Sequence, residues 1–222
     1  RVTPRLPDGY VELGELARVH RGTVTGANKI WVTPRDAVDL PDDLLFPAIT
    51  RARELFAAGE RLSTSDDLKA VIGLPTDLDI LDEPDRKRVD RFLRKAKRLG
   101  VANGYVARNR RAWWSVGLSS PAPILTTYMA RRPPAFVRNA VDARHINIAH
   151  GIYPRETMSD SDLDALAAYL RVNVSTTSGR TYAGGLTKFE PREMERLVVP
   201  DLPLLRDKGR HDSRSAAEIV GV

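Results

Sequence analysis

Residues 81–100 read LDEPDRKRVDRFLRKAKRLG, and this stretch carries the clearest secondary-structure signal of the chain. Apolar side chains recur there at three- and four-residue spacing, which predicts an amphipathic helix; they are Val89, Phe92, Leu93, Ala96 and Leu99. Pro84 suits the first turn, and Gly100 is placed to end the helix. The face opposite the apolar residues is almost wholly cationic.

The cations of this helix belong to a longer basic stretch that runs into Trp113 and Trp114. Asp90 is the one acid among its cations, which are Arg86, Lys87, Arg88, Arg91, Arg94, Lys95, Lys97, Arg98, Arg108, Arg110 and Arg111. Each Lys or Arg that neutralises a phosphate releases a condensed counterion, so affinity for a polyanion accumulates over such a cluster. The stretch indicates nucleic-acid contact, with a solvated basic helix as the alternative. For the two indoles we favour the core over base stacking, because alternate residues of a strand face opposite sides.

The composition of the 222-residue chain is that of a globular protein with many turns. Hydrophobic residues make up 42% of it, and its 15 Gly and 15 Pro favour a loop-rich fold that contains β-structure. The net charge of +6 favours an acidic partner. The chain has no cysteine, which excludes disulfides and thiolate metal sites and fits a cytoplasmic location. No apolar run approaches the roughly 20 residues that cross a bilayer, so we expect no membrane partner.

The two ends of the chain read differently from its middle. The chain begins at Arg1 without an initiator methionine, and Pro4 and Pro7 follow, which is typical of a linker. We interpret residues 1–9 as a linker from an upstream domain and residues 10–205 as one domain. Residues 206–222 are interpreted as a polar C-terminal tail.

Much of the remaining chain is predicted to be β-structure. Alternating apolar residues between Tyr10 and Val32 predict two short strands, joined by the Gly-rich loop 21–28. Ser159 is placed to cap a helix, and a short helix is expected from Pro191. Further strands are expected at residues 44–50, 105–109, 112–118, 123–129, 136–137 and through Ile146 and Ile148.

Familiar catalytic motifs are absent from the sequence. His145 and His150 are five apart, a spacing that suits neither one helical face nor one strand face, so we expect no metal site. There is no Gly-x-Ser-x-Gly elbow, phosphate-binding loop or dinucleotide-binding turn, which removes the usual support for a hydrolase or a nucleotide-binding protein. Three acids, Asp82, Glu83 and Asp85, could bind the metal ion of a nuclease. Negative residues are also favoured at a helix start by the helix dipole, and we prefer that explanation.

Four blocks of sequence resemble the target-recognition region of N6-adenine DNA methyltransferases of the TaqI-like type and of related restriction-modification enzymes. They are Gly179–Pro200 (GRTYAGGLTKFEPREMERLVVP), Arg21–Asn28 (RGTVTGAN), the Tyr105–Val116 stretch with Arg108, Arg110, Trp113 and Trp114, and Phe136–Asn139 (FVRN). Each block is short and degenerate. Their order and spacing, from about Gly14 to Pro200, carry the resemblance.

The resemblance implies a two-part enzyme. An upstream domain would bind S-adenosylmethionine and methylate a flipped adenine, while a downstream domain clamps the duplex and reads its sequence. This chain resembles the downstream part, because the family's Asn/Asp-Pro-Pro-Tyr/Phe motif is missing: the Pro-Pro in Arg132–Ala135 lacks the flanking residues of that motif. A pocket that stacks and hydrogen-bonds a flipped base is not recognisable either.

We therefore expect a DNA-binding chain without catalytic residues, metal or cofactor of its own. S-adenosylmethionine is expected in the upstream domain of an adenine-specific parent enzyme. The expected partners are double-stranded DNA and that upstream methyltransferase domain of the same parent chain. Together with the pattern of strands, the resemblance implies an α+β fold, with a mixed, largely antiparallel sheet or partial barrel and peripheral helices.

The cations and the Gly-rich loops supply the candidate DNA-binding residues. Cations on the predicted helix and around residues 108–111 would mostly hold phosphates and set the register of the protein on DNA. Side chains on Gly-rich loops can approach the duplex closely and read base edges in a groove. The phosphate candidates are Arg91, Arg94, Lys95, Arg108, Arg110 and Arg111, and the loop candidates are Arg21, Thr25, Asn28, Lys29, Arg180 and Lys188.

Two alternatives of other classes stay open at this point. One is a stand-alone metal-dependent nuclease, or another nucleic-acid enzyme, that uses the carboxylates near Asp82 and Asp85. The other is a protein-interaction module whose basic helix binds an acidic partner protein.

Overall fold

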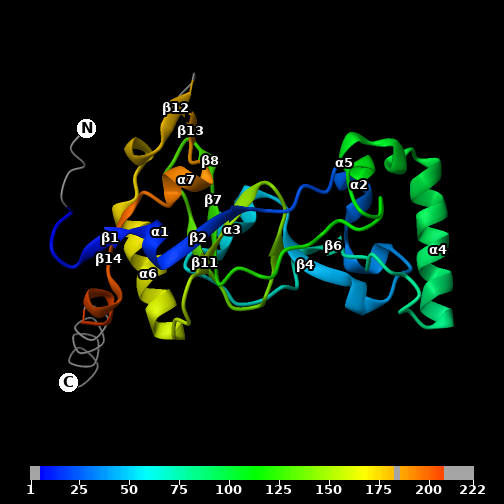
Figure 1. Ribbon diagram of the computed structural model, residues 1–222, viewed down its shortest axis with the longest axis horizontal. Coiled ribbons are helices and arrows are strands. Elements are labelled where there is room, and N and C mark those ends of the chain that lie inside the picture. The colour runs from blue at the N-terminus through cyan, green and yellow to red at the C-terminus, as the bar shows by residue number, and fades with distance from the viewer. Residues whose placement is uncertain (1–5, 183–185, 208–222) are drawn as a thin grey trace.

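The computed structural model describes residues 6–182 and 186–207 and has an α+β architecture with largely antiparallel sheets. Two helices mark opposite ends of its long axis, α6 (Asp160–Asn173) and α4 (Glu83–Arg98) (Figure 1). The two larger sheets follow one another between these ends. The described strands form open sheets and no closed barrel, so the α+β prediction is confirmed in its open-sheet form.

A five-stranded sheet forms the body of the α6 end. Its strands, in order, are β2 (Ala17–Arg21), β11 (Ala149–Pro154), β7 (Ile124–Thr127), β9 (Phe136–Asn139) and β5 (Arg61–Leu62), of which β5 alone pairs in parallel. Helix α6 packs on this sheet through buried Leu163, Leu166 and Leu170. Helix α3 (Ala52–Ala58) contacts β7 and β9 through a separate core cluster around Leu55.

A four-stranded sheet forms the body of the α4 end. Its strands, in order, are β10 (Arg144–His145), β4 (Leu45–Ile49), β6 (Lys69–Ile72) and β3 (Val32–Thr33), and β10 pairs with β4 in parallel. The short helices α2 (Asn28–Trp31) and α5 (Tyr105–Arg108) lie at this end with α4 (Figure 1). Trp31, which is fully buried, lies in the core cluster that α2 shares with α4.

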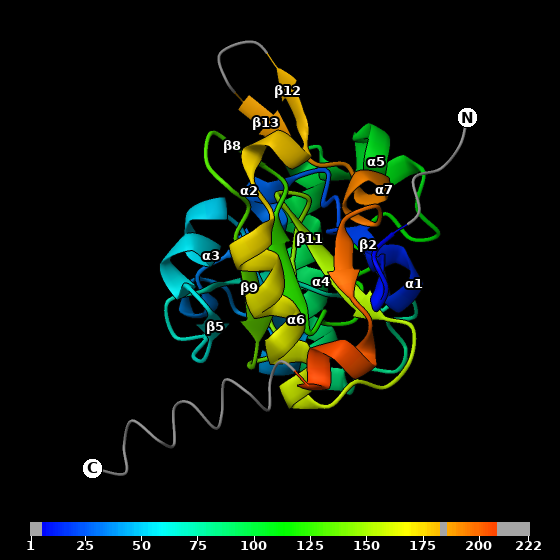
Figure 2. The ribbon, with the colours of Figure 1, turned by 90° about the vertical axis from the view of Figure 1, so that its left-hand side faces the viewer.

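Two small sheets and several single turns complete the fold. β1 (Tyr10–Glu12) pairs with β14 (Val198–Pro200), and β12 (Arg180–Tyr182), β13 (Leu186–Lys188) and β8 (Met129–Ala130) form the other sheet. The turns are the helices α1 (Leu13–Leu16) and α7 (Pro191–Met194) and the 3-10 segments at Arg35–Ala37, Asp42–Leu44, Val101–Asn103 and Thr176–Ser178. Figure 2 shows the β12–β13 pair projecting from the upper edge of the molecule.

Helix α4 forms where the sequence predicted it. The side chain of Asp82 accepts a hydrogen bond from the amide of Asp85 at 3.0 Å, which caps the first turn and confirms the helix-start explanation for this acid. Val89, Leu93 and Ala96 are buried against the core. Gly100 follows the helix at φ +77°, a left-handed conformation that glycine adopts at low cost.

Other predictions of local structure are confirmed as well. The strand predicted at residues 44–50 is β4, and those at 123–129 and 136–137 are β7, β8 and β9. Ser159 caps α6, since its hydroxyl accepts from the Asp162 amide at 3.1 Å. Pro191 begins α7. The strand predicted through Ile146 and Ile148 is displaced, because those residues connect β10 to β11.

Residues 105–118 were wrongly predicted to contain two strands. Residues 105–108 instead form α5, in which Ala107 is buried while Tyr105 and Arg108 are exposed, so the burial does not alternate as in a strand. Residues 112–118 follow an irregular path, since the two indoles there pack into an aromatic cluster rather than on opposite faces of a sheet. Tertiary packing thus overrides the local strand propensity.

The second strand predicted between Tyr10 and Val32 was also wrong. Asn28 begins the single-turn helix α2, and β3 starts only at Val32. β2 and β3 belong to different sheets, so the loop 21–28 connects the two ends of the molecule and is not a hairpin turn.

The loop 21–28 crosses a second connection at a point of close backbone contact. The amide of Gly22 donates to Ala149 O at 3.0 Å, that of Thr23 donates to His145 O at 3.1 Å, and that of Asn147 donates to Thr23 O at 3.1 Å. A Cβ atom on Gly22 would lie 2.1 Å from the carbonyl oxygen of Ile146, which leaves no room for a side chain. These two of the chain segments that run between the sheets are therefore locked to each other by main-chain bonds.

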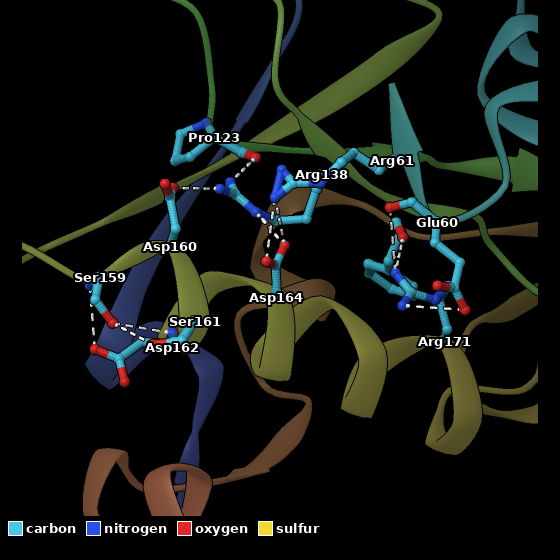
Figure 3. A network of polar contacts seen from close by, with 11 residues as sticks. Glu60, Arg61, Pro123, Arg138, Ser159, Asp160, Ser161, Asp162, Asp164 and Arg171 are labelled. Carbon is cyan, nitrogen blue, oxygen red and sulfur yellow. Dashed lines mark hydrogen bonds and ion pairs between the residues drawn. The ribbon is translucent and has the colours of Figure 1, made fainter. Parts of the chain in front are cut away.

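A buried guanidinium ties α6 to the five-stranded sheet (Figure 3). Arg138 on β9 is 5% exposed and donates to Asp164 and Asp160 on α6, each at 2.8 Å. Its third bond, at 2.7 Å, goes to the carbonyl oxygen of Pro123. This cation is fully engaged in structure, so the FVRN block that resembles the methyltransferase family supports the fold.

The proposed linker and tail fall largely beyond the described residues. Residues 1–5 and 208–222 lie outside them. Of the proposed tail, Arg206 donates twice to the carboxylate of Asp162, at 3.0 Å each. Arg206 therefore belongs to the packed part of the chain.

We predict that Gly22→Ala destabilises the protein by about 3 kcal/mol, because the new methyl group collides with main chain that cannot move without breaking the crossing. Gly104→Ala is the matched control: Gly104 has φ −65°, and its nearest neighbour would be 3.4 Å from the added Cβ. Its cost should stay below about 1 kcal/mol. Urea unfolding of both variants measures the difference, and equal midpoints would contradict the role given to the crossing.

Candidate nucleic-acid interface

The basic helix α4 is divided into two halves by its ion pairs. In the N-terminal half, every cation faces a carboxylate of the helix or of the neighbouring loops, and the same contacts raise the pKa of Arg86 and Arg88 above its ordinary value. The charge of this half is largely compensated within the protein. The pairs are Arg86 with Asp79 and Asp90, Lys87 with Glu83, Arg88 with Asp39 and Asp85, and Arg91 with Asp39.

The C-terminal half of α4 carries cations without internal partners. Arg94, Lys95, Lys97 and Arg98 are all exposed, and none of them forms a hydrogen bond or ion pair with another described residue. Cations are favourable at a helix C-terminus, where the unpaired carbonyl groups concentrate negative potential. These four side chains are therefore free to meet an external anion at little cost in broken contacts.

A cleft of about 350 Å³ brings cations of two segments together between α2 and α4. Lys29 of α2 lines it beside Lys95 and Arg98 of α4. Arg88, Arg91 and Asp39 also line it, and apolar side chains such as Phe92 and Leu99 complete its wall. Two of the candidate residues that are far apart in sequence, Lys29 and Lys95, thus share one positively charged hollow.

The loop 21–28 is fastened to the α5 region by Arg110. Its Nη2 donates to the carbonyl oxygens of Val24 and Thr25, at 2.7 and 3.0 Å. Burial lowers the pKa of this guanidinium, and its Nη1 is buried without a hydrogen-bond partner. The neighbouring cations Arg108 and Arg111 are exposed and have no partner among the described residues.

Within the same loop, the candidates Thr25 and Asn28 have different environments. Thr25 is 1% exposed, and its hydroxyl donates to Oδ1 of Asn28 while accepting from the amide of Ala27 at 3.3 Å. Asn28 and Lys29 are exposed. The loop thus presents the Asn28 amide and turns the threonine inward.

The other three candidate cations lie at the α6 end and are paired. Arg21 contacts Glu190 at 3.0 Å and lies over the ring of Tyr128, while Lys188 contacts the same Glu190. Lys188 and Arg21 hold the pKa of Glu190 below its ordinary value. Arg180 pairs with Glu193. Figures 1 and 2 place the β12–β13 pair and α5 along the same edge of the molecule, so both groups of candidates border one side.

Sequence reasoning missed one exposed aromatic residue on this side. Tyr105 is 79% exposed in the first turn of α5. In the predicted strand, Tyr105 and Ala107 would lie on the same face. In helix α5, Ala107 is buried and Tyr105 is exposed. The predicted packing of the two indoles on the core is confirmed for Trp113 and Trp114. The ring centroids of Trp113 and Trp31 are 6.4 Å apart, and Nε1 of Trp114 donates to Pro75 O at 3.0 Å.

The two histidines lie in the protein interior, near the crossing. His145 and His150 are 4% and 0% exposed, and His150 stacks on Tyr128 with 4.5 Å between ring centroids. Nε2 of His150 lies 3.1 Å from Phe189 O. Burial lowers the pKa of each imidazole to about 4, so both are neutral near pH 7. Within residues 6–182 and 186–207, no three His, Asp or Glu side chains gather closely enough to hold a metal ion.

Comparison with known proteins places the chain in a family. Residues 6–219 match the family described as "Type II methyltransferase M.Eco57I, C-terminal domain". The chain belongs to this family of methyltransferase C-terminal domains. The resemblance to DNA methyltransferases of restriction-modification systems is thus confirmed at the level of type II methyltransferases.

Two curated type II methyltransferases are similar over nearly the whole chain. M.XamI of Xanthomonas campestris pv. amaranthicola is 57% identical over 194 residues, which are 87% of this chain and 37% of that protein. M.AccI of Acinetobacter calcoaceticus is 25% identical over 226 residues, covering 96% of this chain and 39% of that protein. The chain thus spans less than two fifths of the length of these two relatives.

The fold also has a counterpart among solved structures. The crystal structure of the type IIG restriction endonuclease BpuSI matches with a TM-score of 0.56 at 13% identity, over 91% of this chain and 26% of that one. At this identity the match concerns the fold alone. In the described residues, no helix is long and apolar enough to cross a bilayer.

We predict that the buried histidines make stability fall as the pH is lowered from about 6.5 toward 4. In that window the unfolded histidines bind protons while the folded ones, with pKa values of about 4, do not, so protonation favours unfolding by up to about 3 kcal/mol per histidine. Urea unfolding between pH 7 and pH 5 measures this slope. The substitution His145→Gln should flatten it, and an unchanged slope in that variant would contradict the prediction.

Proposed function

We propose that this chain is the DNA target-recognition part of a site-specific adenine methyltransferase in a restriction-modification system, and that it binds DNA without catalysing methyl transfer. The observation that carries the proposal is the set of exposed, uncompensated cations at the α4 end, in a chain that belongs to a type II methyltransferase family. A duplex offers regularly spaced phosphates to such a surface.

The proposal divides the work of the parent enzyme between two parts. The curated relatives extend well beyond the matched region, and that additional length would hold S-adenosylmethionine and the catalytic residues. The present chain lacks the Asn/Asp-Pro-Pro-Tyr/Phe motif. Its contribution would be to hold the duplex in register while the other part acts on a flipped adenine.

Phosphate contacts come mainly from the α4 end in this proposal. Arg94 and Lys95 bind without giving up an internal partner, and Arg108 and Arg111 do the same beside α5. The remaining α4 candidate, Arg91, would have to exchange its contact with Asp39 for a phosphate. Such surface pairs are worth little, about 0 to 1 kcal/mol, so this exchange is feasible.

A second set of contacts comes from the β12–β13 side. Arg21, Arg180 and Lys188 are each paired with a glutamate of residues 190–193, and we propose that they meet the duplex on the edge they share with α5. Asn28 and Lys29, which are exposed, are the candidates for base edges or nearby phosphates.

The carboxylates of the nuclease alternative have structural tasks. Asp82 caps α4, and Asp85 pairs with Arg88 at 3.3 Å. Magnesium-dependent cleavage of plasmid by the chain, abolished by Asp85→Ala, would contradict the present proposal.

We predict that replacing Arg94, Lys95 and Lys97 by alanine together weakens binding to every duplex and lowers the salt slope of the binding constant by roughly 3. Each lost phosphate contact removes about 0.9 from that slope. Fluorescence anisotropy with a random-sequence duplex at several salt concentrations measures it. An unchanged slope would show that this half of α4 does not face DNA, and a flat response of the unsubstituted chain would favour the protein-interaction alternative.

A charge-matched pair of single variants sharpens this test. Arg94→Ala and Lys87→Ala each remove one positive charge from α4, but Lys87 is already paired with Glu83 at 2.6 Å. The slope should fall by about 0.9 for Arg94→Ala and change less for Lys87→Ala. Equal effects would indicate a response to net charge without a defined interface.

A further inference from the structure

The arginines around α5 differ in what their guanidinium groups do. Arg108 is exposed and has no partner in the described chain. Arg110 donates two hydrogen bonds to main-chain carbonyls of the loop 21–28, at Val24 and Thr25. A guanidinium that is partly buried against its own backbone is poorly placed to meet a phosphate as well.

The loop held by Arg110 contains a second fixed contact. The Thr25 hydroxyl has its one proton directed to Oδ1 of Asn28 and accepts from the Ala27 amide. In this arrangement Oδ1 of Asn28 accepts from the hydroxyl, and the Nδ2 donors take no part in the contact. Its two N–H donors, with one lone pair of Oδ1, are left for an outside partner on an exposed side chain.

Packing of the loop against α5 strengthens the same arrangement. Gly26 has φ +75°, and a Cβ atom there would lie 2.8 Å from Cβ of Val106 in α5. The loop backbone therefore lies directly on the helix that precedes Arg110. With two carbonyls bonded and one glycine in close contact, the loop has little freedom to reorient Asn28.

We propose that Arg110 and Thr25 are positioning residues, which hold the Asn28 amide in one orientation toward a hydrogen-bond acceptor on duplex DNA and do not touch the DNA themselves. This inference rests on the proposed function and refines it, because both residues were candidates for direct contact. The acceptor is an oxygen or nitrogen of a base edge or a phosphate oxygen, since an amide donates to either.

Preorientation gives a role to a partly buried cation at this position. An amide that rotates freely must lose that freedom on binding, at a cost of about 0.5 to 1.5 kcal/mol for an immobilised side chain. Where contacts within the free protein already hold the amide, this freedom is lost on folding and not on binding. The same logic accounts for a threonine whose hydroxyl is buried: its task is to accept and donate within the loop.

The experiment compares Arg110→Met, Thr25→Val and Asn28→Ala with Arg108→Met as the matched control, in anisotropy titrations across a range of salt. Two probes are used: a random-sequence duplex, and a duplex enriched from a random pool by the unsubstituted chain. We expect Arg110→Met, Thr25→Val and Asn28→Ala each to weaken binding about five- to tenfold with an unchanged salt slope, as loss of one oriented neutral hydrogen bond would. Arg108→Met should lower the slope by about 0.9.

Double substitutions test whether the positioning residues act through Asn28. Thr25→Val combined with Asn28→Ala should bind no more weakly than Asn28→Ala alone, whereas Arg108→Met combined with Asn28→Ala should show the product of the two single effects. A fall of the salt slope with Arg110→Met, or an additive effect of Thr25→Val, would overturn the inference. Thr25→Val keeps side-chain shape, so it remains informative if Arg110→Met fails to fold.

The two probes separate the possible acceptors. A loss confined to the enriched duplex in Asn28→Ala places the acceptor on a base edge, and an equal loss on both duplexes places it on the backbone; no loss on either overturns the inference. Failure of the proposed function is distinct, since the unsubstituted chain would then show no salt-dependent binding to either duplex.

Discussion

The arrangement of the molecule depends on the crossing of two main-chain segments at Gly22. One segment leads from β2 to α2, and the other leads from β10 to β11. Three backbone hydrogen bonds join them, and the carbonyl of Ile146 occupies the space that a Cβ atom of residue 22 would need. The first runs from the five-stranded sheet to α2, which β3 of the four-stranded sheet follows, and the second runs from the four-stranded sheet to the five-stranded one. The core cluster that holds Ile49 of β4 with Leu125 of β7 also spans the two sheets, so the crossing and this cluster together hold the end with α6 against the end with α4.

Charge is distributed on this frame according to whether a cation has a task within the fold. Arg138 is 5% exposed and is satisfied by two carboxylates and a carbonyl, which is the condition under which a buried charge is tolerated. The N-terminal half of α4 is laced by surface pairs, which add little stability but cancel charge. In the C-terminal half of the helix and at Arg108 and Arg111, the cations have no such partner among the described residues. Net charge alone would not have separated these three classes of arginine.

The sequence was sufficient wherever structure follows from local signals. Helix α4 could be predicted because its cap, its apolar spacing and Gly100 agree, and α6 because Ser159 precedes a regular apolar face. Residues 105–118 could not, since their conformation is decided by contacts with distant parts: Val106 packs on Gly26, and Trp113 packs near Trp31. The same limit applied to the candidate site. The sequence gives no reason to assign different roles to Arg108 and Arg110. In the structure, Arg108 is exposed and Arg110 donates to the loop carbonyl of Val24.

Under the proposed function, the difference between Arg108 and Arg110 shows how one surface can both tolerate small shifts of a duplex and hold a polar group in fixed geometry. Long cationic side chains on a surface reach phosphates by many rotamers, which gives affinity that tolerates small shifts of the duplex. Discrimination needs the opposite property, a polar group whose geometry is fixed before the encounter, because orientation acquired on binding weakens the contact it permits. At Asn28 this requirement is met, because Arg110 holds the loop by its carbonyl groups and Thr25 contacts the amide. Between Gly22 and Arg111, the fold thus holds some hydrogen-bond donors in fixed positions and leaves others mobile. The number of basic residues in the sequence does not show this difference.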